Sequence, residues 1–214
     1  FARYWVHNGF ITVNGAKMAK SEGNFLTVRD LLAKHPAEAI RLTMLKTHYR
    51  QPLDWTDEAV RESKAELDRF YLAFRDAGEA GIEIPRDAAI PAPVLQALED
   101  DLNTPQAIAH MHELVRELNI SARAGEPIEQ ERLAASLLAA GQVLGLLQQA
   151  PQAWLQGGDA GGQATAIEDL IDRRNAAKKA KDFAEADRIR KELADQGIVL
   201  EDKPGGKTEW RRAG

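Results

Sequence analysis

The chain contains no cysteine, which excludes disulfide bonds, thiolate nucleophiles and thiolate metal sites within its 214 residues. It also lacks any apolar run of about eighteen residues, the length that a membrane-spanning helix requires. Its first ten residues do not follow the basic-then-apolar order of a secretory signal. We therefore expect a cytoplasmic protein with no membrane partner.

The charge is unevenly distributed. The chain carries a net charge of -5, which argues against a protein that coats nucleic acid without specificity. Residues 172–191 are an exception, because eight basic residues there face only four acidic ones. With 44% hydrophobic residues the chain can bury a core in one or two domains. It begins with Phe1 inside an apolar, aromatic stretch, and we interpret it as a fragment of a longer protein.

Local patterns predict a mainly α fold. Asn14-Gly15 between two short apolar arms predicts a hairpin over residues 10–20. Thr27 and Pro36 are typical of the starts of two short helices that follow. Four amphipathic helices in succession then predict an antiparallel bundle; they begin near Thr56, Val94, Pro105 and residue 129, and the last ends near residue 147.

The remainder of the chain predicts a linker and a small second module. Residues 148–166 are rich in Gly, Gln and Ala and lack apolar periodicity, which is typical of a flexible linker. Two helices are expected over 167–181 and 183–196, with Asp182 capping the second. "IVLED" at 198–202 is expected to form a strand.

The ten residues "AKMAKSEGNF" at 16–25 contain two lysines three apart. Mobile ammonium groups on a loop can follow the charge of a triphosphate, but such a pair is also common on solvated loops. Gly23 and Asn24 have a structural interpretation as well, Gly23 through an unusual backbone angle and Asn24 through a side-chain cap. The glycine-rich cradle of a P-loop is absent.

Lys17-Met18-Ala19-Lys20-Ser21 resembles the KMSKS signature of class I aminoacyl-tRNA synthetases, with Ala19 where that family usually has serine. Longer segments in the same order resemble cysteinyl-tRNA synthetases across essentially the whole chain: "YWVHNGFITVNGAKMAKSEGNF", "AEAIRL", "HYRQPLDWT" and "AKDFAEADRIRKELADQGIVLED". The resemblance implies an antiparallel helical bundle between an N-terminal remnant of a class I catalytic domain and a small α+β C-terminal module. The corresponding parts would be a catalytic remnant over 1–55, a tRNA-binding bundle over 56–147, the linker over 148–166 and an anticodon-binding module over 167–214.

The resemblance also implies an activity for the full-length protein, which would activate cysteine with ATP and Mg²⁺ and transfer it to its tRNA. Lys20 would stabilise the departing pyrophosphate with help from Lys17, and the ATP-binding set would be Lys17, Met18, Lys20 and Ser21. The HIGH motif and the Zn²⁺ site would lie in the missing half, so the fragment alone should not aminoacylate. The five histidines here show no metal-ligand spacing. A monomer is the family expectation.

The C-terminal module contains the residue types that read single-stranded RNA, which are rings for stacking, carboxylates for base edges and cations for phosphates. The candidates are Lys178, Phe183, Asp187, Asp202, Trp210 and Arg211. Three of them have a structural alternative: Phe183 shares a helical stripe with core positions, Asp187 can be a solvated residue, and Trp210 can anchor the chain end. The resemblance places Lys178, Phe183, Asp187 and Asp202 where cysteinyl-tRNA synthetases read a GCA anticodon, although arginine is usual at the position of Lys178.

Two further features of the sequence bear on its RNA contacts and its function. "HYRQPLDWT" resembles the segment that contacts the inner side of the tRNA, so Tyr49 and Arg50 are expected to meet its backbone, whereas Trp55 is expected in the core. The alternative functions are a free-standing RNA-binding or regulatory protein derived from a synthetase, and a relative that joins cysteine to an amino-sugar. The RNA-type C-terminal end argues against the amino-sugar relative.

Overall fold

A computed structural model describes the chain over residues 1–19, 21, 23–157 and 163–213. These residues form two compact units, Phe1–Gln148 and Gln149–Gly214. Among the described residues, no helix combines the length and the apolar character needed to cross a membrane. Each unit is described by itself below.

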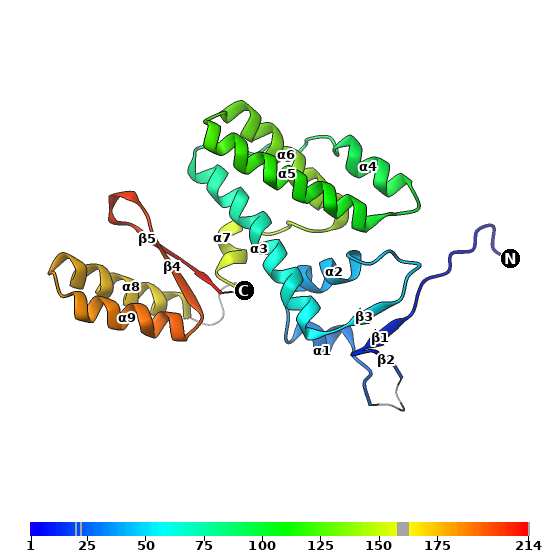
Figure 1. The fold of residues 1–214 in the computed structure, drawn as a ribbon, viewed down its shortest axis with the longest axis horizontal. Helices are drawn as coiled ribbons and strands as arrows, with labels where there is room; N and C mark the ends of the chain where they lie inside the picture. The colour runs from blue at the N-terminus through cyan, green and yellow to red at the C-terminus, as the bar shows by residue number, and fades with distance from the viewer. Residues whose placement is uncertain (20, 22, 158–162, 214) are drawn as a thin grey trace. The chain divides into compact units, whose positions relative to one another are not determined.

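The first unit opens with a small sheet in the order β2-β1-β3 (Figure 1). Its strands are β1 (Ile11–Val13), β2 (Ala16–Lys17) and β3 (Leu53–Trp55). Between β1 and β2, Asn14 and Gly15 have φ of 52° and 78°, the left-handed values of a type I′ turn, so the predicted hairpin is confirmed. The parallel pairing of β1 with β3 was not predicted, because three residues are too few to show alternation.

Two short helices follow the hairpin. Helix α1 (Val28–Leu32) begins with a reciprocal capping box, in which the Thr27 hydroxyl accepts from the Asp30 N–H and the Asp30 carboxylate accepts from the Thr27 N–H. Helix α2 (Ala37–Leu45) starts directly after Pro36, whose restricted φ suits a helix start. Both starts lie where the sequence predicts them.

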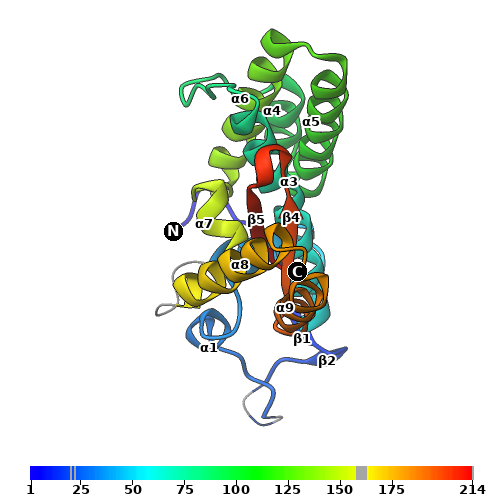
Figure 2. The ribbon, with the colours of Figure 1, turned by 90° about the vertical axis from the view of Figure 1, so that its left-hand side faces the viewer.

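The rest of the first unit is the predicted helical bundle. It comprises α3 (Asp57–Glu79), α4 (Ala92–Glu99), α5 (Thr104–Ala124) and α6 (Pro127–Leu144). Helices α4, α5 and α6 lie side by side in both views (Figures 1 and 2). The apolar stripes of α3 to α6 form the core, in which the largest fully buried side chains include Phe70, Tyr71, Met111 and Leu137. Trp55 is also buried, as expected. The mainly α fold class is therefore confirmed.

The second unit consists of a helical pair and a strand hairpin. Its elements are α7 (Pro151–Leu155), α8 (Gln163–Lys179), α9 (Phe183–Asp195), β4 (Ile198–Asp202) and β5 (Thr208–Arg212). Strands β4 and β5 pair antiparallel, with Asp202 opposite Thr208. Side chains of α8, α9 and the hairpin bury one core, formed by Ile167, Ile171, Ile189, Leu193, Ile198 and Trp210.

The segment expected to be a linker, residues 148–166, contains regular structure. Helix α7 lies within it, begins with Pro151 in its first turn, and buries Trp154 and Leu155. Helix α8 begins at Gln163, four residues before the predicted start at Ile167. The prediction missed α7 because a five-residue helix is too short to show a period of 3.6 residues.

Candidate functional site

The loop after the β1–β2 hairpin is closed by one side chain. The Asn24 Oδ1 accepts from the Ala19 N–H at 2.9 Å, and the Asn24 Nδ2 donates to the Lys17 carbonyl at 3.0 Å. These two bonds join the start and the end of the predicted phosphate loop. Asn24 therefore has the capping role expected of it, and Gly23, at φ 66°, has the left-handed angle expected of it.

The predicted loop residues are only partly visible. Lys17 and Ser21 are exposed and Met18 is half-buried. Lys20, the residue assigned the leading role at the pyrophosphate, lies outside the described residues. Of the predicted pair, Lys17 is the member that lies among the described residues, and its side chain is available to solvent.

A second cluster joins the segment after α2 to the loop before α5. The Asp101 carboxylate accepts from the Tyr49 hydroxyl at 2.6 Å and from the Arg50 Nη2 at 3.1 Å, and Arg50 Nε lies 2.9 Å from its other oxygen. The hydrogen bonds from Tyr49 and then Arg50 lower the pKa of Asp101. Asp101 and Leu102 both have left-handed backbones, at φ 55° and 54°. Tyr49 and Arg50, predicted to meet tRNA backbone, are therefore held in place by a carboxylate that the sequence did not reveal.

In the second unit, Lys178 and Asp202 are brought together. The Lys178 ammonium lies 2.7 Å from Asp202 Oδ2. Arg174, with a side chain only 4% exposed, donates to both Asp202 oxygens at 2.9 Å. Hydrogen bonds from Arg174 and then Lys178 hold the pKa of Asp202 well below its usual range. The carboxylate is therefore ionised and fixed in one orientation.

Phe183 and Asp187 lie close by on the first turns of α9. Phe183 is 64% exposed, although Ala186, Ile189 and Leu193 on its stripe are buried. The alternative of Phe183 as a core residue is thus wrong, because the ring stands at the solvated end of the stripe. Asp187 is exposed. The pKa of Arg174 is raised chiefly by Asp202 and also by Asp187, so the Asp187 carboxylate lies within electrostatic reach of the same guanidinium.

Trp210 and Arg211 lie apart from the exposed cluster that contains Lys178 and Asp202. Trp210 is 5% exposed within the core of the second unit, and its indole N–H has no hydrogen-bond partner in the described part of the chain. A ring buried to this extent offers no face to a base, so Trp210 fits the alternative of a hydrophobic anchor. Successive residues of a strand face opposite sides of the sheet. Asp202 and its partner Thr208 therefore share one face of the hairpin, and Arg211 lies on the other.

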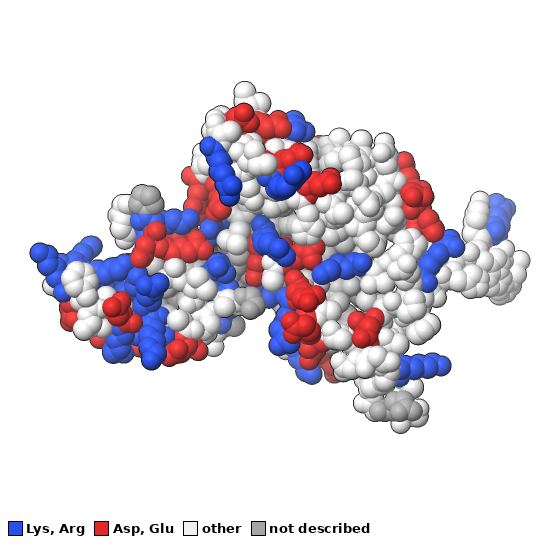
Figure 3. All heavy atoms as spheres, viewed as in Figure 1, with Lys and Arg blue, Asp and Glu red and all other residues white. Residues whose placement is uncertain are grey.

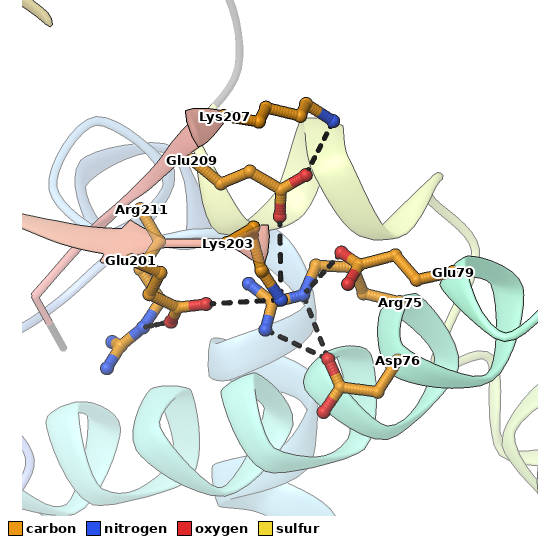
Figure 4. Close-up of polar contacts among 8 residues, drawn as sticks. All are labelled: Arg75, Asp76, Glu79, Glu201, Lys203, Lys207, Glu209 and Arg211. Carbon is orange, nitrogen blue, oxygen red and sulfur yellow. Dashed lines mark hydrogen bonds and ion pairs between the residues drawn. The ribbon is translucent and has the colours of Figure 1, made fainter. Parts of the chain in front are cut away.

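The far face of the hairpin is occupied by ion pairs (Figure 4). Arg211 Nε contacts Glu201 at 3.1 Å, and Lys207 contacts Glu209 at 2.7 Å. Lys203 lies 3.9 Å from Glu201 and 3.8 Å from Glu209. Lys and Arg side chains gather instead where α8 ends and α9 begins, and blue spheres mark this end of the helical pair in Figure 3. The basic stretch at 172–191 is thus a surface of this helical pair.

Comparison with protein families divides the chain into three parts. Residues 1–65 match tRNA synthetases class I (C) catalytic domain, residues 93–148 match the DALR domain, and residues 161–211 match Cysteinyl-tRNA ligase anticodon binding domain. The chain belongs to the cysteinyl-tRNA synthetase family.

Individual members of the cysteinyl-tRNA synthetase family match along the whole chain. It is 52% identical over 213 residues to a Cysteine–tRNA ligase from Xanthomonas campestris, with 100% of this chain and 45% of the relative covered. It is 53% identical over 216 residues to one from Rhodospirillum rubrum, with 100% of this chain and 46% of the relative covered. The chain thus spans about half the length of the curated relatives it matches.

Sequence reasoning did not single out two residues of this synthetase-family chain that organise its candidate sites. Arg174 appeared only as one of eight basic residues, although it follows Ile171 by three positions and so shares the buried face of α8. A basic residue on the apolar face of a helix was the signal that could have indicated a buried, paired Arg174. Asp101 gave no such signal, because its partners Tyr49 and Arg50 are distant in sequence.

Proposed function

We propose that this chain is the tRNA-reading part of a cysteine–tRNA ligase and also carries its phosphate loop. The whole protein would activate cysteine with ATP and Mg²⁺, release pyrophosphate and pass the cysteinyl group to the 3′ end of its tRNA. Family membership and the match of residues 161–211 to an anticodon-binding domain support this proposal.

One observation carries the proposal. At the α8–α9 end of the second unit, a fixed carboxylate at Asp202 lies beside the Lys178 ammonium. Phe183, with its exposed ring, and Asp187 stand on the adjoining turn of α9. A stacking ring, base-edge acceptors and a phosphate-binding cation are the groups that an RNA loop requires. Lys178, Phe183, Asp187 and Asp202 therefore form the proposed anticodon-reading set.

The phosphate loop would act in the activation step. An ammonium placed near the departing pyrophosphate stabilises the negative charge that builds there, and Lys20 would supply it with assistance from Lys17. Met18 and Ser21 would complete the ATP-binding loop. In a full-length ligase, Lys20→Ala should slow ATP–pyrophosphate exchange roughly 100- to 1,000-fold and leave tRNA binding nearly unchanged, whereas unchanged exchange would remove the assignment.

The zinc of the full-length enzyme would not be held by these residues. The chain has no cysteine, and no cluster of three or more His, Asp and Glu side chains suited to a metal is found in the residues described. The donor set therefore does not fit a zinc site, and no step of the proposal passes through one. A cytoplasmic location and a monomeric state complete the proposal.

The test is binding of the 214-residue chain to cysteine tRNA and to the same tRNA with its GCA anticodon changed, each at several salt concentrations. Preference for the intact anticodon is expected, because base contacts specify sequence and phosphate contacts do not. Equal affinities with a steep salt dependence would mean that only the basic surface of α8 and α9 binds, and would overturn the proposed reading of bases.

The two alternative functions make different predictions. A cysteine-to-amino-sugar ligase would need no anticodon-type domain, and residues 161–211 match one. A free-standing RNA-binding protein derived from a synthetase would show the same anticodon preference in vitro. The transcript distinguishes it, because one reading frame that also encodes the HIGH motif would exclude the free-standing form.

A further inference from the structure

The Asp202 carboxylate is surrounded by donors. Among the described residues, four donor atoms reach it: Arg174 Nη1 and Nη2 at 2.9 Å each, Lys178 Nζ at 2.7 Å and Thr208 Oγ1 at 2.8 Å. A carboxylate offers about four lone-pair positions. A further donor, such as the amino group of a base, therefore cannot simply be added to Asp202 and must replace one of the donors already there.

The Arg174 guanidinium is the least replaceable of these donors. It binds both carboxylate oxygens in the bidentate geometry that guanidinium favours, and its side chain is 4% exposed. Its Nε–H is buried with no other partner in the described residues. Separating Arg174 from Asp202 would leave a buried charge uncompensated, which is strongly unfavourable.

The other two donors are held more weakly. Within the described part of the chain, the Lys178 ammonium makes one polar contact through a flexible stem, and its side chain is 39% exposed. The Thr208 hydroxyl also lies 3.1 Å from Asn175 Oδ1, and its one proton can serve only one of these two acceptors at a time. Of the two, only the ammonium occupies Oδ2, the oxygen it shares with Arg174 Nη2.

We propose that Asp202 reads RNA by exchange: Arg174 holds the carboxylate in place, and a base amino or imino group displaces the Lys178 ammonium from Oδ2. This inference rests on the proposed function. Arg174 is then a positioning residue that acts through Asp202. The ammonium leaves with its three protons and its charge, and becomes available to a phosphate of the same RNA.

The chemistry at Asp202 favours a base as the incoming group. A carboxylate repels phosphate but accepts from the exocyclic amino groups of cytosine, adenine and guanine. Before binding, Lys178 pairs with Oδ2 beside Arg174 Nη2, and because the Asp202 side chain is 49% exposed, an incoming base can reach this oxygen. The free protein thus holds its reading group in one orientation, with both carboxylate oxygens hydrogen-bonded.

The exchange separates the expected effects of the two cations. We define the preference ratio as the affinity for intact cysteine tRNA divided by the affinity for the anticodon-changed tRNA. Losing Lys178 removes a phosphate contact that every tRNA shares, together with a competitor for Asp202. Losing the two hydrogen bonds from Arg174 instead lets the Asp202 carboxylate rotate, and the preference ratio depends on its fixed orientation.

The experiment measures this ratio, the salt dependence of binding and the melting temperature for the whole chain and its variants. Asp202→Asn should lower the ratio roughly 5- to 100-fold, the range of one good base contact. Arg174→Lys should lower it to a similar extent, and the double variant should lower it no further than Asp202→Asn alone. Lys178→Met should weaken binding to both tRNAs, reduce the salt slope by about 1 and leave the ratio unchanged or higher. Lys191→Met, an exposed charge on α9, controls for loss of charge alone.

Each contrary result has a definite meaning. A wild-type ratio of 1 overturns the proposed function and this inference with it. A wild-type preference that Arg174→Lys retains, with only the melting temperature lowered, overturns this inference alone and makes Arg174 purely structural. A ratio lost in Lys178→Met as in Asp202→Asn also overturns it, because Lys178 would then read the base itself.

A second measurement on the wild-type chain covers the case in which Arg174→Lys fails to fold. Side-chain nitrogen NMR of the free and tRNA-bound chain reports on both cations directly. The Arg174 Nη–H signals should keep their shifts and protection when tRNA binds, and the Lys178 ammonium signal should move. An unmoved lysine signal in a complex with anticodon preference would overturn the exchange.

Discussion

The Glu38 carboxylate accepts a hydrogen bond from the backbone N–H of Leu147, 2.8 Å away and 109 residues later in the chain. It also accepts from the Gln148 N–H at 3.1 Å and from the Tyr71 hydroxyl at 2.9 Å. Glu38 is 6% exposed. One buried side chain on α2 therefore fixes the segment that follows α6 at the end of the first unit.

Replacing Glu38 with alanine should be strongly destabilising. The change leaves two backbone N–H groups and one hydroxyl without their acceptor, and a buried unsatisfied group costs about 1–3 kcal/mol. Urea denaturation should report the loss. Tyr71→Phe is the matched control, because it removes one donor and leaves both backbone bonds, at about 0.5–1.5 kcal/mol. Equal costs for the two variants would contradict the anchoring role of Glu38.

Gly9 and Gly78 should respond in opposite directions to substitution by alanine. A Cβ at Gly9 would lie 2.1 Å from the Gln51 carbonyl oxygen, so the backbone would have to move, at about 1–3 kcal/mol. A Cβ at Gly78, near the end of α3, would meet nothing within 4 Å, and the helix should gain about 0.5–1 kcal/mol. Melting temperatures would test both changes, and a neutral Gly9→Ala would contradict the close backbone approach.

Asn24→Ala should open the predicted phosphate loop without unfolding the unit. The Ala19 N–H loses its acceptor and the Lys17 carbonyl its donor, so the Ala19 amide should exchange with solvent faster. Hydrogen exchange followed by NMR would measure this. Asn119→Ala, at an exposed position on α5, is the control and should leave the Ala19 amide unchanged. An equally slow Ala19 amide in Asn24→Ala would refute the loop closure.

Phe183 and Trp210 should separate binding from stability. Phe183→Ala should cost about 1–3 kcal/mol of tRNA affinity through lost stacking and leave the melting temperature nearly unchanged. Trp210→Ala should instead cost about 3–5 kcal/mol of stability, because it empties a core position. Tight tRNA binding by a folded Phe183→Ala variant would exclude stacking on this ring.

The second unit should lose stability in acid through Asp202. Hydrogen bonds from Arg174 and Lys178 lower its pKa from 3.8. A lowered pKa stabilises the fold fully above the unfolded value, and this contribution is lost as pH falls below about 4. Denaturation midpoints should therefore fall more steeply between about pH 4 and about pH 2 in the wild type than in Asp202→Asn. Parallel curves would show that the Asp202 ion pairs contribute nothing to stability, which is the case for many exposed ion pairs.

Much of the fold follows from local sequence signals. Asn14-Gly15 predicted the hairpin because few residue pairs adopt two left-handed angles, and Thr27 predicted the start of α1 because its hydroxyl caps locally. Strand β3 was missed because its partner β1 lies some forty residues away and pairs with it through backbone atoms. Helix α7 was missed because packing of Trp154 and Leu155, rather than periodicity, marks it.

The candidate site was predictable in composition but not in arrangement. The sequence indicated Lys178 and Asp202 as RNA-reading groups, yet it could not show that they contact each other, because their contact depends on how β4 packs against α8. Periodicity placed Phe183 on the core stripe. The core does not extend to the first residue of α9, so Phe183 is left in solvent. Side-chain exposure at the end of a helix is a tertiary property.

The excess of basic residues over 172–191, where α8 ends and α9 begins, has a consequence for how a polyanion arrives. The chain as a whole is negative, at -5, whereas residues 172–191 hold eight basic and four acidic residues, so an RNA would be drawn to that stretch more than to the rest of the chain. Such a field selects orientation as well as rate, because an encounter elsewhere is less favourable before any contact forms. The anticodon-reading set would therefore be found by approach from one direction, and raising the salt concentration should reduce that directional bias before it disrupts the base contacts.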